Sequence, residues 1–180
     1  MSENRRNQNI VLIGFMGTGK STVAHRFSTQ HRLRMIDTDQ VIAKREGMSI
    51  GDIFATYGEE HFRKLETRVL MELQYKKNVV ISCGGGMPLR FSNVQMMKAI
   101  GPVVLLTANP ETIYERVRRN ENRPILAGRN NISYITELME QRSEKYKAAA
   151  DFVIATDGKT VAEICEELSR LLNEREPSNW

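Results

Sequence analysis

The sequence predicts an α/β fold in which helices flank a five-stranded parallel sheet in three layers. Short apolar runs alternate along the chain with longer amphipathic stretches, and this alternation is typical of parallel strands joined by helices. The first apolar run, at 9–14, reads NIVLIG and is apolar at successive positions before it ends in glycine. A continuous run of this kind indicates a strand that is buried on both faces.

The remaining elements follow in order. A helix is expected at 20–30, and further strands are expected at 33–37, 79–82, 102–107 and 152–155. Each of these strand-like runs is short and largely apolar, as average strands are.

Capping residues mark two of the later helix starts. Asn109 and Pro110 place a capping side chain before a proline at the first helical position. Thr160 and Glu163 have the spacing of a capping box, and the apolar residues after them share one helical face. That face is expected to pack in the core.

Two segments interrupt the alternation. The segment at about 38–77 holds two or three consecutive helices, with breaks at 46–48 and near 57–58, and we expect it to be an inserted substrate-binding region. The polar segment at about 117–131 is expected to be a lid over the nucleotide. The length of the chain indicates a single domain over 1–180.

Composition and charge argue against several functional classes. The apolar runs are too short to span a bilayer, and the polar start of the chain does not resemble a signal peptide. Cys83 and Cys165 form no Cys-x-x-Cys pair, as expected of reduced thiols in the cytoplasm. The net charge of +4 reflects an arginine cluster at 116–129, which favours a phosphorylated ligand over nucleic acid. We expect a cytoplasmic monomer without membrane or nucleic-acid partners.

Residues 14–21 read GFMGTGKS and match the phosphate-binding pattern G-x-x-x-x-G-K-S between a strand and a helix. In such a loop the backbone N–H groups and the helix N-terminus attract phosphate. Lys20 is placed to reach the β- and γ-phosphates, and Ser21 is placed to ligate Mg²⁺. We therefore expect ATP and Mg²⁺ as cofactors. The expected nucleotide-binding residues are consecutive: Gly17, Thr18, Gly19, Lys20, Ser21 and Thr22.

Acidic residues and glycines follow the second and third predicted strands. Ligands of open α/β sheets bind beyond the carboxyl ends of the strands, so Asp37 is expected near the metal and Asp39 near a substrate hydroxyl. Alternatively, either carboxylate caps the following helix. Gly84, Gly85 and Gly86 predict a backbone that a ligand approaches closely, or else a flexible turn.

Two arginines are candidate clamps for an anionic substrate. Arg63 and Glu66 are three residues apart on a predicted helix, where a surface ion pair is the alternative interpretation. Arg142 lies on the helix before the last strand, where the alternative is a solvated side chain.

Taken in order, these motifs resemble those of the shikimate kinases. The similarity spans about 10–159 and rests on GFMGTGKST, DTD, FRKLE, SCGGG, RPIL and RSEKY. The resemblance implies the three-layer P-loop kinase fold and transfer of the γ-phosphoryl group of ATP to the 3-hydroxyl of shikimate. The implied products are 3-phosphoshikimate and ADP, on the route to chorismate and aromatic amino acids.

The resemblance also assigns roles to individual residues. Lys20, Asp39 and the lid residue Arg123 match catalytic positions, and Arg119 matches a position beside the adenine. Arg63 and Arg142 are implied to hold the carboxylate of shikimate. The full set of implied substrate-binding residues comes from four segments: Asp39, Arg63, Gly84, Gly85, Gly86 and Arg142.

Other functions fit parts of the same sequence. A sugar-acid kinase of the gluconate-kinase type shares the phosphate loop and an acceptor that carries a carboxylate. A nucleotide-binding regulatory NTPase needs only the loop. A nucleoside-monophosphate kinase fits less well, because no base-recognition pocket is evident.

Overall fold

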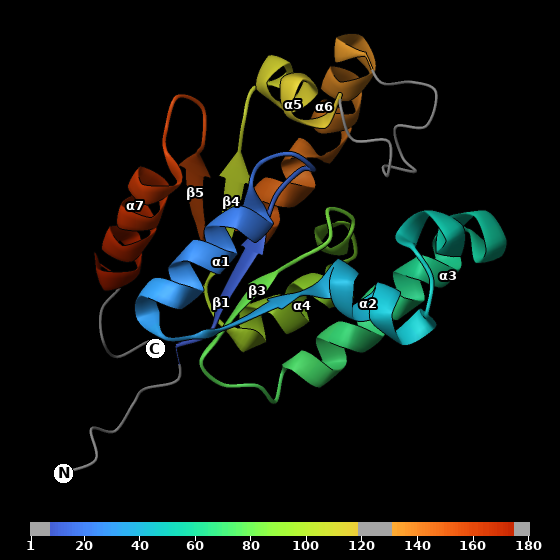
Figure 1. The fold of residues 1–180 in the computed structure, drawn as a ribbon, viewed down its shortest axis with the longest axis horizontal. Coiled ribbons are helices and arrows are strands. Elements are labelled where there is room, and N and C mark those ends of the chain that lie inside the picture. The colour runs from blue at the N-terminus through green and yellow to red at the C-terminus, as the bar shows by residue number, and fades with distance from the viewer. Residues whose placement is uncertain (1–7, 119–130, 175–180) are drawn as a thin grey trace.

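The computed structural model describes residues 8–118 and 131–174 (Figure 1). Its five strands form one sheet in the order β2-β3-β1-β4-β5, and every pairing is parallel. The strands are β1 (Ile10–Ile13), β2 (Arg34–Asp37), β3 (Val79–Ser82), β4 (Val103–Thr107) and β5 (Phe152–Ala155). The predicted α/β fold with a five-stranded parallel sheet is therefore confirmed.

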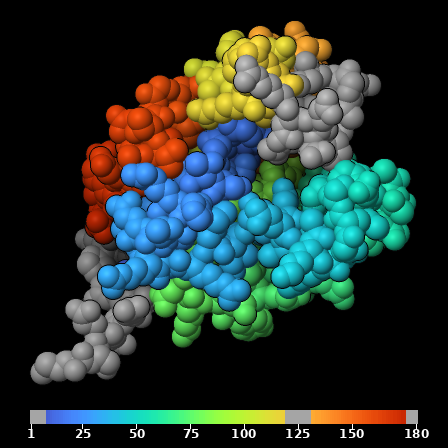
Figure 2. Space-filling view, viewed as in Figure 1, coloured from blue at the N-terminus to red at the C-terminus, as the bar shows by residue number. Residues whose placement is uncertain are grey.

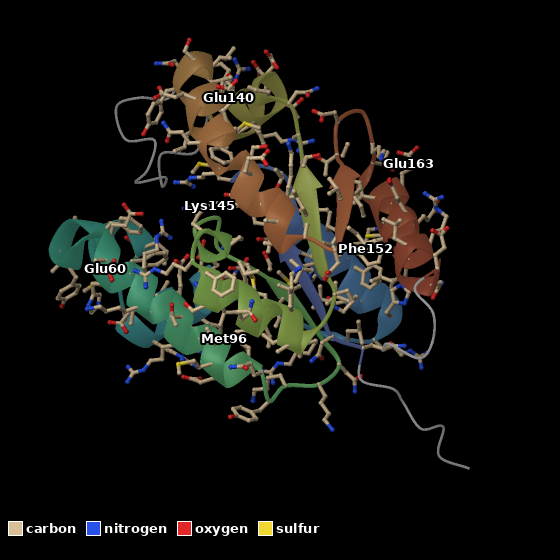
Figure 3. All side chains as sticks on the ribbon, turned by 180° about the vertical axis from the view of Figure 1, so that it is seen from behind. Glu60, Met96, Glu140, Lys145, Phe152 and Glu163 are labelled. Atoms are coloured by element: carbon tan, nitrogen blue, oxygen red, sulfur yellow. The ribbon has the colours of Figure 1, made fainter. Side chains whose placement is uncertain are left out.

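Helices cover both faces of the sheet. They are α1 (Lys20–His31), α2 (Thr38–Glu46), α3 (Ile50–Leu73), α4 (Phe91–Ile100), α5 (Pro110–Val117), α6 (Ile132–Ala149) and α7 (Val161–Glu174), with a short 3-10 turn at Met87–Leu89. In Figure 1 α1 and α7 lie on the near face, and Figure 3 shows α3, α4 and α6 on the opposite face. None of the helices in this part of the chain is long and apolar enough to cross a membrane.

The packing of β1 on both faces explains why its sequence is apolar at successive positions. Ile10 and Leu12 belong to the core beneath α1 and α7, whereas Val11 and Ile13 belong to the core beneath α3, α4 and α6. Side chains alternate between the faces of a strand, so a sheet covered on both sides requires apolar residues at every position.

The two predicted caps differ in outcome. Thr160 and Glu163 form the capping box, because the Thr160 amide donates to the Glu163 carboxylate at 2.7 Å and the Glu163 amide donates to Thr160 Oγ1 at 3.2 Å. Asn109 occupies the cap position of α5, but its side chain makes no capping hydrogen bond. Its backbone N–H instead donates to the Asp157 carboxylate at 3.0 Å.

Both predicted breaks in the helical segment after β2 are present. Gly47 ends α2 with a φ of 67°, and Gly58 interrupts α3 with a φ of 79° and a ψ of 172°. Because helical residues do not adopt these angles, the part of α3 after Gly58 starts in a new direction. That part carries Arg63 and Glu66. Most of the predicted lid lies outside the described residues.

Candidate active site

A cavity of about 410 Å³ opens at the carboxyl ends of the central strands. In Figure 2 the blue segment with the phosphate loop lies between the cyan helices α2 and α3 and the yellow helix α5. Every predicted site residue in the described part of the chain lines this cavity except Thr18. Segments far apart in the sequence thus meet at the sheet edge where α/β proteins bind ligands.

The phosphate loop is held in shape by its own side chains. Lys20 Nζ donates to the carbonyl oxygens of Gly14 and Phe15, each at 2.9 Å. Thr18 is buried, and its Oγ1 donates to the Phe15 carbonyl at 2.8 Å. The Thr18 side chain therefore braces the loop from within instead of facing the cavity.

Gly17 is required at its position for two reasons. Its φ of 79° lies in the left-handed region, which residues other than glycine rarely adopt. A Cβ atom there would also lie 2.9 Å from Val117 Cγ1 on α5. The phosphate loop thus packs directly on α5.

Asp37 caps the following helix, which was the alternative interpretation, and its second carboxylate oxygen contacts Ser21. Its Oδ1 caps α2 by accepting from the amides of Asp39 at 3.1 Å and Gln40 at 3.2 Å. Its Oδ2 accepts a 2.6 Å hydrogen bond from Ser21 Oγ, which also lies 3.2 Å from Ser82 Oγ. The pairing of Asp37 with Ser82 in neighbouring strands places the carboxylate at the start of α1.

The Ser21–Asp37 pair has the chemistry of a Mg²⁺ site. Mg²⁺ prefers oxygen ligands and takes only one or two from the protein when phosphates supply others. A hydroxyl beside a carboxylate meets that requirement. Residues 8–118 and 131–174 contain no group of three or more His, Cys, Asp or Glu suited to a metal ion.

Arg63 and Glu66 form a buried ion pair, so the alternative of a surface pair is wrong. Arg63 is 6% exposed and Glu66 is fully buried, and Arg63 Nη1 donates to Glu66 Oε2 at 2.8 Å. Burial raises the pKa of the Glu66 carboxyl to about 7, against the opposing influence of the Arg63 charge. Glu66 Oε1 has no hydrogen-bond partner among the described residues.

Two of the three consecutive glycines make room for the protein's own side chains. A Cβ atom on Gly84 would lie 2.5 Å from Asp39 Oδ1 and 2.9 Å from Glu66 Oε1, and one on Gly86 would overlap the Arg63 guanidinium. Gly85 is different, because its nearest neighbours would be 3.6 Å away. At Gly84 and Gly86, side chains of the predicted site therefore pack against the glycine backbone.

Arg142 reaches the cavity from α6. It is 9% exposed, and its guanidinium carbon lies 5.8 Å from the centre of the Phe15 ring, within the range of a cation–π contact. Tyr146, one turn later, donates from its hydroxyl to the Gly85 carbonyl at 2.6 Å. The alternative of a solvated arginine is therefore wrong.

Sequence reasoning missed an apolar wall of the cavity. Phe54 and Phe62 line it with ring centroids 4.7 Å apart, and the Arg63 guanidinium lies within 6 Å of both rings. The break at Gly58 hid the signal, because it removes the regular helical spacing between the two residues. Phe62 stands directly before Arg63, which was the available clue.

Arg116 is the first residue of the arginine cluster at 116–129. It lies on α5 and donates to the Gly17 carbonyl at 3.0 Å and to Thr156 Oγ1 at 3.2 Å. It ties the phosphate loop to the turn after β5. The predicted lid and adenine residues, Arg123 and Arg119, lie outside the described residues.

Comparison with known proteins decides the family. The family model described as shikimate kinase matches residues 16–173. The chain belongs to the shikimate kinase family. Its members are ATP-dependent kinases of the shikimate pathway, so the expected enzyme class is confirmed. A shikimate kinase of Caldanaerobacter subterraneus is 42% identical over 91% of this chain and 95% of its own. One from Persephonella marina is 42% identical over 89% and 96%.

Solved structures agree with this assignment. A shikimate kinase from Acinetobacter baumannii in complex with shikimate has a TM-score of 0.90 and 31% identity, covering 94% of both chains. The enzyme from Aquifex aeolicus has a TM-score of 0.81 and 37% identity, covering 92% of this chain and 96% of its own. A gluconokinase from Sinorhizobium meliloti, at 17% identity and a TM-score of 0.57, shares the fold alone. The similarity therefore favours a shikimate kinase over a sugar-acid kinase.

Proposed function

We propose that the cavity binds Mg²⁺–ATP and shikimate side by side and transfers the γ-phosphoryl group to the 3-hydroxyl of shikimate. The observation that supports this most is that one cavity joins the phosphate loop to Asp39, Arg63 and Arg142. The similar enzyme from Acinetobacter baumannii was solved with shikimate bound. Products of the reaction are 3-phosphoshikimate and ADP.

On the nucleotide side, the loop amides and the N-terminus of α1 attract the phosphates. Lys20 Nζ is held by the loop carbonyls of Gly14 and Phe15 and supplies a positive charge for the β- and γ-phosphates. Ser21 and Asp37 would hold Mg²⁺, which neutralises phosphate charge when bound.

On the acceptor side, two buried arginines face the carboxylate of shikimate. The planar guanidinium matches a carboxylate through two parallel hydrogen bonds, and Arg63 and Arg142 approach from α3 and α6. Phe54 and Phe62 offer an apolar surface to the carbon ring. A substrate that has one carboxylate on a partly apolar ring fits this lining.

Asp39 is assigned to the attacking hydroxyl. It lies in the first turn of α2 and lines the cavity beside Gly84. Phosphoryl transfer requires mainly positioning and charge stabilisation, so Asp39 orients the hydroxyl and accepts its proton as the bond to phosphorus forms. Arg123 and Arg119, carried over by resemblance, would add charge from the lid and contact the nucleotide.

We further propose that the enzyme works as a monomer in the cytoplasm. One chain alone brings the phosphate loop together with Asp39, Arg63 and Arg142. Cys83 and Cys165 are both free and buried, as suits a reducing compartment.

Release of ADP, coupled to a spectroscopic readout, tests the function. We expect rapid release with shikimate and only slow release with gluconate or without an acceptor. Lys20→Met should lower the rate with shikimate about 100-fold or more while circular dichroism stays unchanged. Equal rates of ADP release with and without shikimate would reject the proposal, because a regulatory NTPase hydrolyses ATP without a small-molecule acceptor.

A further inference from the structure

The Arg63 guanidinium donates hydrogen bonds to two carboxylates of the protein. The proposed function requires it to bind a third carboxylate, that of the substrate. Glu66 binds Nη1 at 2.8 Å. Glu59 approaches another edge of the guanidinium, where its Oε1 accepts from Nη2 at 2.7 Å and from Nε at 3.2 Å. The Nε–Nη2 edge is one that guanidinium offers for bidentate carboxylate recognition.

The two glutamates differ in how easily they leave the arginine. Glu66 is fully buried, so separating it from Arg63 would strand a carboxylate without water, which is strongly unfavourable. The side chain of Glu59 is 62% exposed, and the residue directly follows the break at Gly58. A released Glu59 carboxylate returns to water, and exposed pairs of this kind contribute little to stability.

We propose that Glu59 is an internal competitor of the substrate, whose carboxylate occupies the Nε–Nη2 edge of Arg63 until the carboxylate of shikimate displaces it. This inference rests on the proposed function, in which Arg63 binds that carboxylate. Glu59 keeps the buried guanidinium paired while the site is empty. It also disfavours small anions, which lack the ring and hydroxyl contacts that compensate a substrate for displacing Glu59.

The test compares Glu59→Gln with a matched control on the same helix. Glu60 is the neighbouring carboxylate, labelled in Figure 3, and pairs with Arg90 at 2.7 Å instead of with Arg63. Glu60→Gln removes the same charge one residue away. It therefore separates local competition from a general change in electrostatic potential.

Calorimetry without nucleotide measures the binding directly. Glu59→Gln should bind shikimate about two- to five-fold more tightly than the wild type, the range expected for removing one exposed ion pair. Its inhibition constant for acetate, measured against shikimate, should fall by a similar factor. Glu60→Gln should change neither quantity, and the KM for ATP should be unaffected in both variants.

Each other outcome has a distinct meaning. Weaker or unchanged shikimate binding in Glu59→Gln would overturn the inference, because Glu59 would then position Arg63 or play no part. An equal gain in Glu60→Gln would also overturn it. If the wild type binds shikimate in the calorimeter but does not phosphorylate it, the proposed reaction fails while the competition by Glu59 is still measured. If it binds no shikimate, both fail.

Discussion

The Ser21 hydroxyl and the Asp37 carboxylate share a 2.6 Å hydrogen bond that joins the start of α1 to the end of β2. The other oxygen of Asp37 caps α2. One carboxylate therefore caps the start of α2, the helix that carries Asp39, and also supplies an oxygen to the proposed metal site.

Asp37→Asn separates these two roles. Asparagine caps helices as well as aspartate does, so the free energy of unfolding should change by less than about 1 kcal/mol. The loss of a charged oxygen should raise the Mg²⁺ concentration for half-maximal activity about 10-fold or more. Mg²⁺ titration and urea unfolding of the same samples measure both effects. A large loss of stability with an unchanged Mg²⁺ requirement would assign Asp37 to capping alone.

Arg142→Ala should raise the KM for shikimate about 10- to 100-fold, because a charged hydrogen-bonding partner of the carboxylate is lost. The KM for ATP should change far less. Arg142→Lys keeps the charge but not the two-pronged geometry and should recover only part of the affinity. Steady-state kinetics with each substrate varied in turn decide the matter, and equal effects on both KM values would contradict the carboxylate role.

Gly84→Ala should destabilise the protein by about 1–3 kcal/mol, because the new methyl group would crowd Asp39 and Glu66. Gly85→Ala is the matched control, since its nearest neighbours would be 3.6 Å away. It should leave the free energy of unfolding nearly unchanged while weakening shikimate binding. Urea unfolding and calorimetry distinguish the two variants, and equal destabilisation would show that the glycines act only as a turn.

Glu66 makes stability depend on pH. Its pKa rises on folding from 4.5 to about 7 because the carboxyl is buried, so the folded state keeps a proton that the unfolded state loses in this window. The free energy of unfolding contributed by Glu66 therefore falls as pH rises from about 4.5 to about 7.

Glu66→Gln should remove that dependence. The wild type should lose stability relative to the variant as pH rises from about 4.5 to about 7, as measured by urea unfolding at each pH. Parallel curves for the two proteins would show that Glu66 is ionised throughout.

The sequence predicted those parts of the molecule that depend on local pattern. The buried β1 strand, the breaks at Gly47 and Gly58, and the capping box at Thr160 all follow from periodicity or from single-residue preferences. The phosphate loop was equally predictable, because its shape needs glycines at fixed spacing.

The remaining features depend on contacts between distant segments. Whether Gly84 faces a ligand or Asp39 is decided only when β3 and α2 come together. The Arg116 contact with Gly17 spans 99 residues, so the local charge cluster does not reveal it. The fully buried Glu66 was likewise invisible, since spacing alone does not tell a surface pair from a buried one.

The identity of the phosphorylated product tests the central claim most directly. Shikimate and gluconate, supplied together at equal concentration with Mg²⁺–ATP, should give a single phosphomonoester on the 3-hydroxyl of shikimate. ³¹P and ¹H nuclear magnetic resonance should show it forming in equal amount with ADP. Phosphogluconate as the main product, or ADP accompanied by free phosphate and no ester, would contradict the account.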